Sequence, residues 1–191
     1  MTRLLIAGGG HSDVPLIQAA RNLGWTVATA GNRPAEPGHR YSNVFLHCDY
    51  SDPQAVLAAA QQFQADAVCA CCNDFSALSC AFVAAQLQLP GHDTPEICSI
   101  IHHKDRWRQF SQQAQLPGPQ AVGCTDAAGV KAAVKQLGLP VIVKPVDLTG
   151  GKGIQTAHTL EEAIASAQTA LAASRSEEHT SELQSPCNLV C

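Results

Sequence analysis

The chain has 191 residues, of which 46% are hydrophobic, and a formal net charge of −4; this length fits one large or two small domains, and the composition is that of a folded globular protein. Acidic and basic residues are mixed along the chain, which argues against a nucleic-acid-binding surface, and no apolar run reaches the ~18–20 residues that span a membrane. The apolar run before Gly8 is too short for a signal peptide, so we expect a cytoplasmic protein whose nine cysteines are reduced.

Residues 1–95 alternate short apolar runs with segments of helical periodicity. Strands are predicted at residues 4–7, 25–30, 44–48 and 67–72. Helices are predicted to begin at Ser12 or Asp13, at Asp52 with Pro53 in the first turn, and after the last of these strands. This alternation is typical of an α/β domain with a doubly wound parallel sheet.

The pattern changes after residue 91, and residues 96–174 predict the start of a smaller α+β domain. A helix is predicted from Thr94–Pro95 into the charged segment 104–108. The elements predicted after it are a strand near residues 121–122, a helix over 126–137, strands at 141–145 and 154–157, and a last helix that begins with the capping-box spacing of Thr159 and Glu162.

Residues 175–191 differ in character from the rest of the chain. The segment 175–185 reads RSEEHTSELQS and is similar to the in-frame translation of a common sequencing adapter. We therefore predict an artefactual tail outside the native fold, with a natural polar tail as the alternative. On this interpretation the domain over residues 96–174 is incomplete.

A glycine-rich segment, Gly8 to Asp13, lies between the first strand and the first helix, where backbone amides and the helix dipole favour an anion. The dinucleotide-binding fingerprint is not matched, because Asp13 stands where a glycine is required and Gly31–Asn32 stands where an acidic residue is expected. The residues predicted to bind the acceptor substrate are Gly9, Gly10, His11, Ser12, Asn73 and Asp74, which lie at strand ends. A plain tight turn is the alternative.

The closely spaced cysteines Cys69, Cys71, Cys72 and Cys80 suggest a metal or redox site. On the predicted strand, however, successive side chains point to opposite faces, which prevents them from converging on one ion. Free cysteine is also among the most frequently buried residue types. We therefore interpret these residues as small core side chains and predict no metal site.

The clearest indication of a binding site comes from Lys104, Lys144 and the loop 149–153, which reads TGGKG. A triphosphate requires spaced ammonium groups and backbone N–H donors, and glycines allow a loop to approach closely. Lys144 ends an apolar strand, which is an unusual place for a lysine. The motif is not a Walker loop. The alternatives are an exposed lysine at a sheet edge and an ordinary β-turn.

From about Arg3 to Ala173 the chain resembles ATP-grasp enzymes, above all the branch that contains biotin carboxylase and the large chain of carbamoyl phosphate synthetase. The segments that carry the resemblance are His102–Phe110, Gly138–Pro145 and Thr149–Ile154. It implies that Lys104 contacts ATP phosphate and that Lys144 reaches the phosphate and adenine region. It also implies that the loop containing Gly150, Gly151, Lys152 and Gly153 closes over the phosphates, and that residues 1–95 form the Rossmann-like domain that precedes the ATP-grasp fold.

The activity that this resemblance implies is ATP-dependent ligation of a carboxylate to an amine or similar nucleophile through an acyl phosphate, with ATP and Mg²⁺ as cofactors. The Mg²⁺ ligands and catalytic residues of the family lie on a later lobe that has no counterpart in this sequence, so we expect the chain itself to be inactive and no metal ligands within it. The full-length protein is compatible with a homo-oligomer. The alternatives are a non-catalytic nucleotide-binding module and, less favoured, a dinucleotide-dependent oxidoreductase.

Overall fold

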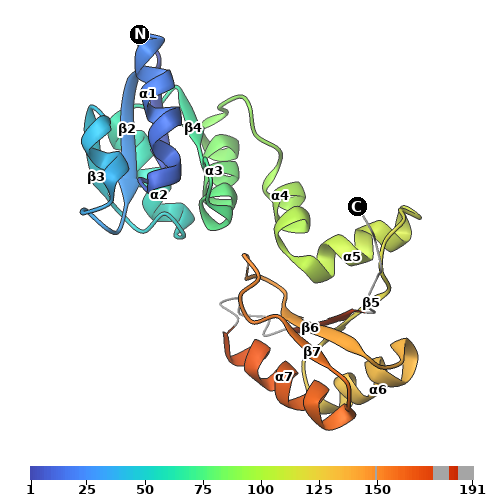
Figure 1. Cartoon of the computed structure of the whole chain (residues 1–191). Coiled ribbons are helices and arrows are strands. Elements are labelled where there is room, and N and C mark those ends of the chain that lie inside the picture. Colours follow the sequence, from blue (N-terminus) through green and yellow to red (C-terminus); the bar gives the residue numbers. More distant parts are fainter. Residues whose placement is uncertain (149, 174–180, 185–191) are drawn as a thin grey trace. The chain divides into compact units, whose positions relative to one another are not determined.

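The computed structural model describes residues 1–148, 150–173 and 181–184, and the chain divides into an N-terminal unit, Met1–Ser99, and a C-terminal unit, Ile100–Cys191 (Figure 1). The division lies close to the boundary predicted at residue 95. Within the described ranges, every helix is too short or too polar to cross a membrane.

The N-terminal unit is built on a parallel sheet with strand order β3-β2-β1-β4. Its strands are β1 (Arg3–Ala7), β2 (Thr26–Gly31), β3 (Val44–His47) and β4 (Ala67–Cys69). Its helices are α1 (Val14–Asn22), α2 (Pro53–Phe63) and α3 (Asp74–Leu87), with short 3-10 turns η1 (His11–Asp13) and η2 (Pro37–Tyr41). The predicted doubly wound α/β sheet is therefore confirmed.

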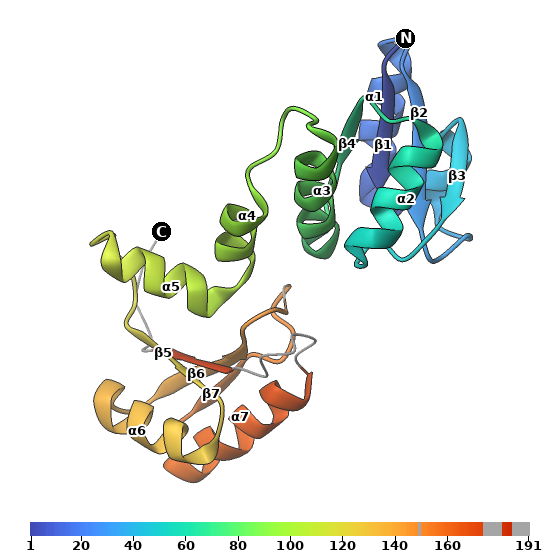
Figure 2. The same cartoon turned by 180° about the vertical axis from the view of Figure 1, so that it is seen from behind.

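The two faces of this sheet are covered by different helices, as Figures 1 and 2 show from opposite sides. Leu4 and Ile6 of β1 pack with Ile17 of α1, whereas Leu5 and Ala7 belong to the core that includes residues of α2 and α3. This division follows from the two-residue period of a strand, which sends successive side chains to opposite faces. Both faces are apolar, so the strands read as continuous hydrophobic runs.

Two helices of this unit begin at the caps that their sequences provide. The Asp52 carboxylate accepts hydrogen bonds from the backbone N–H groups of Gln54 and Ala55. The Asn73 side chain accepts in the same way from Phe75 and Ser76. The predicted strand over residues 67–72 was too long, because β4 ends at Cys69 and the chain then turns toward α3.

The C-terminal unit has an antiparallel sheet with strand order β5-β8-β6-β7. Its strands are β5 (Ala121–Cys124), β6 (Val141–Pro145), β7 (Gln155–Ala157) and β8 (Ser181–Gln184). Helix α4 (Pro95–His102) crosses the division between the units and is followed by α5 (Lys104–Gln113), α6 (Ala127–Leu137) and α7 (Leu160–Ala173). The single helix predicted from residue 95 onward is thus two helices.

Alternation also divides the side chains of this second sheet. Val141 and Val143 of β6 and Leu183 of β8 are fully buried in a core shared with α6 and α7. Lys144 of β6 and Glu182 of β8 alternate with these residues and pair with each other on the opposite face, toward α5. The strand period therefore explains why an apolar strand carries a lysine.

Strand β8 lies within the segment that the sequence analysis sets outside the fold. It pairs with β5, where Val122 is opposite Leu183, and with β6, where Lys144 is opposite Glu182. Residues 174–180 and 185–191 lie outside the described residues. The artefactual origin of residues 175–191 stays a prediction, whereas the structure gives four of these residues a central place in the sheet.

Candidate functional site

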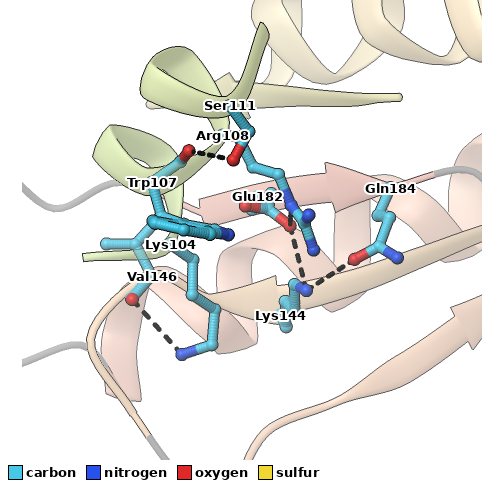
Figure 3. Close-up of polar contacts among 8 residues, drawn as sticks. All are labelled: Lys104, Trp107, Arg108, Ser111, Lys144, Val146, Glu182 and Gln184. Carbon is cyan, nitrogen blue, oxygen red and sulfur yellow. Dashed lines mark hydrogen bonds and ion pairs between the residues drawn. The ribbon is translucent and has the colours of Figure 1, made fainter. Parts of the chain in front are cut away.

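Lys104 is the first residue of α5, and its polar groups all point to the chain that follows β6. Its backbone N–H donates to the carbonyl oxygen of Val146 at 3.1 Å. Its Nζ donates to the same oxygen at 3.2 Å (Figure 3). The Nζ also donates to the carbonyl oxygen of Leu148. The side chain is half-buried, and it is held at the end of β6 where the glycine loop begins.

Lys144 lies on β6, two residues before the carbonyl that Lys104 contacts, so the structure brings the two predicted lysines to the same strand end. Its Nζ donates to Gln184 Oε1 at 2.6 Å and forms an ion pair with Glu182 Oε1 at 3.0 Å (Figure 3). The Lys144 side chain is 13% exposed, against 1% for that of Glu182. The alternative of an exposed lysine at a sheet edge is therefore excluded.

Glu182 is a residue of this site that sequence reasoning missed. Besides Lys144, it faces Arg108 of α5, whose Nε lies 3.7 Å from Oε1. Among the described residues, neither Glu182 oxygen accepts a hydrogen bond of good geometry, so the buried carboxylate is compensated by the charges of Lys144 and Arg108. The signal was available in the sequence as the polar–apolar–polar alternation of Glu182, Leu183 and Gln184, but it falls in the segment that was set aside.

The loop between β6 and β7 uses glycine for backbone conformation. Gly150, Gly151 and Gly153 have φ angles of 66°, 75° and 73°, a region that other residues rarely adopt. A Cβ on Gly150 or Gly151 would meet nothing within 4 Å, so packing does not require glycine there. These residues and Lys152 are exposed, which leaves the loop open to a ligand. Thr149 lies outside the described residues.

A second group of predicted residues surrounds a cavity of about 110 Å³ in the N-terminal unit. The cavity is lined by Gly8, Gly9, Gly10, Ser12 and Asp13, by Cys72 and Asn73, and by Glu36 and Tyr50. The structure thus gathers Gly9, Gly10, Ser12 and Asn73, as expected of neighbouring strand ends. His11 and Asp74 are exposed and do not line this cavity.

Glycines of the segment 8–13 also contribute to the packing and hydrogen bonding of the fold. The Gly10 N–H donates to Asp13 Oδ2 at 2.8 Å, so this amide is already engaged and does not face an anion. A Cβ on Gly9 would lie 2.0 Å from Cε1 of His39, which requires glycine for packing. Burial lowers the pKa of His39. Packing against His39 therefore accounts for glycine at position 9, and the role of Gly9 and Gly10 toward a substrate stays a prediction.

The cysteines separate into two groups. Cys80 is fully buried, as predicted for a core residue, and burial raises its pKa to about 12. Cys71 and Cys72 follow β4 rather than belonging to it, and their Sγ atoms lie 3.6 Å apart. Burial, then the hydrogen bond to Asp13, raises the pKa of Cys71 to about 12. The reading of these two cysteines as strand residues with divergent side chains is therefore wrong.

Comparison with known proteins identifies the domain that carries the two lysines. Residues 103–183 match the family model of the carbamoyl-phosphate synthase L chain, ATP binding domain. This part of the chain belongs to the ATP-grasp superfamily. The matched range contains Lys104, Lys144 and the whole loop 149–153, and it ends within β8.

The curated relatives of this chain include formate-dependent phosphoribosylglycinamide formyltransferases. That of Burkholderia thailandensis is 26% identical over 153 residues, which cover 80% of this chain and 38% of the relative. That of Prochlorococcus marinus (strain MIT 9313) is 28% identical over 176 residues, which cover 90% and 44%. The chain therefore spans about two fifths of the length of these relatives.

Solved structures share the fold of this chain. The N5-carboxyaminoimidazole synthetase of Staphylococcus aureus, complexed with ADP, has a TM-score of 0.81 at 16% identity and aligns over 98% of this chain and 48% of its own. The biotin carboxylase domain of the Hydrogenobacter thermophilus 2-oxoglutarate carboxylase, complexed with MgADP, ADP and bicarbonate, has a TM-score of 0.79 at 17% identity, over 98% and 44%. At these identities the likeness establishes the fold alone.

Proposed function

We propose that this chain is the ATP-binding portion of an ATP-dependent ligase that joins a carboxylate to an amine or similar nucleophile. The observation that carries the proposal is the convergence of Lys104 and Lys144 at the end of β6, beside a loop with three glycines of positive φ. These parts lie within the range that matches an ATP-binding domain. ATP is the ligand whose charge fits two lysines and an open glycine loop.

The two lysines would act on the triphosphate by neutralising charge. Each ammonium is half-buried and anchored, Lys104 by backbone carbonyls and Lys144 by Glu182 and Gln184, so neither needs to be ordered when nucleotide arrives. Phosphate oxygens would take the place of some of these oxygens as acceptors. Positioning and charge neutralisation supply most of the rate in phosphoryl transfer.

In the proposed reaction a substrate carboxylate oxygen attacks the γ-phosphorus of ATP, and the bond to ADP breaks to give an acyl phosphate and ADP. The nucleophile then attacks the acyl carbon, and inorganic phosphate leaves with the electron pair of the broken C–O bond. The backbone N–H groups of the exposed loop over residues 150–153 would donate to the phosphates. The substrates belong to the whole protein.

Mg²⁺, which the family implies, finds no three-residue ligand set beside the lysines among the residues that the structure describes. Glu182 is the acidic side chain paired with Lys144, and it is fully buried between two cations. We therefore derive no step through a metal from these residues. Glu182 acts instead as the counter-ion that holds Lys144 in place.

Nucleotide titration of paired charge variants tests the proposal. Removing Lys144 alone would leave Glu182 buried beside one remaining cation, which costs about 3–5 kcal/mol, so the lysine is removed in an E182Q background. We expect E182Q to keep or strengthen ATP binding, because Lys144 is freed from its carboxylate. We expect the double variant K144Q/E182Q to lose most of this affinity, measured by calorimetric titration with Mg-ATP.

A matched control is K131A, which removes an exposed lysine of α6. This variant should bind ATP as the unmodified chain does. Equal affinity of E182Q and K144Q/E182Q would exclude Lys144 from the site. Failure of the unmodified chain to bind ATP would overturn the proposal that this portion holds the nucleotide by itself.

A further inference from the structure

The turn that follows β4 brings three metal-ligating side chains together in the N-terminal unit. Asp13, Cys71 and Cys72 each present one ligand atom, and these atoms lie within 4.8 Å of one another. Asp13 ends the turn η1, whereas the cysteines follow β4, so two distant segments of the chain contribute. Among the described residues, no other group of three His, Cys, Asp or Glu side chains meets this condition.

The backbone of Cys71 is what turns both thiols to the same side. Its φ of 50° lies in the left-handed region, which is uncommon for a residue with a side chain and is kept where the surroundings impose it. The Sγ atoms of Cys71 and Cys72 are 3.6 Å apart as a result. Two thiolates on one tetrahedral ion with bonds of ~2.3 Å would be about 3.8 Å apart, so the pair is already spaced for an ion.

The carboxylate of the group is held in a fixed orientation. Asp13 is 5% exposed, and its Oδ2 accepts the Gly10 N–H at 2.8 Å. A Cβ on Gly8 would lie 2.7 Å from the same oxygen, so the close approach requires glycine at position 8. A ligand that is already ordered loses little conformational freedom on binding.

The group is open on one side. Cys72 is exposed, and both Cys72 and Asp13 line the cavity of about 110 Å³ described above. Glu36 lines the same cavity and adds a second carboxylate to its wall. The cavity thus provides an entry path and a negative environment, as a cation requires.

We propose that Asp13, Cys71 and Cys72 bind a thiophilic divalent cation of the Zn²⁺ type, with a fourth coordination position open to the cavity. Two sulfur ligands and one carboxylate oxygen suit Zn²⁺ and Cd²⁺, whereas Mg²⁺ and Ca²⁺ prefer oxygen alone. An anionic ligand would bind the metal ion at this open position. It would not bind the Gly10 N–H, because that group already donates a hydrogen bond to Asp13. The site lies in the N-terminal unit and is independent of the proposed nucleotide binding.

The first test uses the intact reduced chain without substitution. Cysteines are alkylated with N-ethylmaleimide in the presence and absence of Zn²⁺, and modification of each cysteine is followed by peptide mass spectrometry. We expect Zn²⁺ to slow alkylation of Cys71 and Cys72 together by about tenfold, as for a site about nine-tenths occupied, and to leave Cys98 unchanged. Unchanged rates at Cys71 and Cys72 would overturn the proposal.

The second test is a Cd²⁺ titration followed by the ultraviolet thiolate-to-metal absorption. C71S/C72S should lose one equivalent of bound Cd²⁺. D13N keeps an oxygen acceptor for the Gly10 N–H and should weaken binding by about 10–100-fold. The matched control C48S/C98S removes two half-buried thiols elsewhere and should leave binding unchanged.

Three outcomes of the titration are decisive. Loss confined to C71S/C72S and D13N supports the proposal. Equal loss in the control pair would assign the metal to dispersed thiols and overturn it, as would full binding by C71S/C72S. If C71S/C72S does not unfold cooperatively, the alkylation rates of the unmodified chain decide.

Discussion

His39 shows how one buried residue shapes the glycine segment. Its ring packs against Gly9, its Nδ1 lies 2.9 Å from Thr29 Oγ1, and its Nε2 has no hydrogen-bond partner in the part of the chain that the structure describes. A protonated ring would need an acceptor for each N–H group, and burial disfavours the charged form. The neutral ring is therefore part of the fold of the N-terminal unit.

We predict that the stability of this unit decreases in acid because of His39. Burial lowers its pKa below the ordinary value of 6.5, against smaller opposing effects of Glu36, the Arg33 backbone and Asp13. The unfolded chain then binds more protons between the two pKa values, so the free energy of unfolding falls as the pH drops below about 6.5. Urea unfolding at about pH 7.5 and 5.5 measures this loss, which should be smaller in H39F.

The exposed His11 provides the matched control for this prediction. H11F should show the same pH dependence as the unmodified chain. If H39F and H11F lose equal stability on acidification, the dependence belongs to the acidic residues of the unit and not to His39.

At the scale of elements, the helix caps carry a measurable share of stability. The Asp52 side chain accepts from two backbone N–H groups at the start of α2, at 2.9 and 3.3 Å. We predict that D52A lowers the free energy of unfolding by about 1 kcal/mol, whereas D52N, which keeps the acceptor, costs only a few tenths. Urea midpoints followed by circular dichroism compare the variants, and equal losses in D52A and D52N would contradict the capping role.

Local signals predicted most of these elements, because caps and apolar periods depend on neighbouring residues only. Two helix starts were predicted in this way. Asp52 caps α2, and the Asp126 side chain caps α6 by accepting a hydrogen bond from the Gly129 N–H at 2.7 Å. The turn at Cys71 was not predicted, because the apolar run continues through it. Its left-handed conformation is also not indicated by a glycine in the sequence.

The two candidate sites differ in how far the sequence predicted them. Lys104 and Lys144 were found through their motifs, and alternation along β6 accounts for the placement of Lys144. Glu182 and the Asp13–Cys71–Cys72 group depend on contacts between distant segments, which no local pattern contains. Such pairings arise from sheet order and from the conformation of a single residue.

For the whole molecule, β8 is the strand that joins β5 to the rest of the C-terminal sheet. Within the described ranges, β5 hydrogen-bonds to the sheet only through β8. Leu183 contributes to the core under α6 and α7, and Glu182 balances Lys144 and Arg108. Removing β8 therefore removes a strand partner, a core side chain and a counter-ion together.

We predict that truncation after Ala173 destabilises the C-terminal unit and leaves the N-terminal unit folded. Hydrogen exchange by mass spectrometry should show lost protection in β5 and β6 and unchanged protection in β1 and β2. Truncation after Gln184 retains β8 and is the matched control. If residues 175–191 contribute nothing to the fold, both truncated chains will exchange alike.

The place of β8 also sets an order of events during synthesis on the ribosome. All strands of the N-terminal sheet have been made once residue 69 is added, so this sheet can close while the rest of the chain is still being translated. In the other unit, β5 stays an unpaired strand edge while α6, β6, β7 and α7 are made, and its partner arrives only with residues 181–184. Exposed strand edges attract other chains, so the interval between β5 and β8 is the period in which this protein most needs a chaperone.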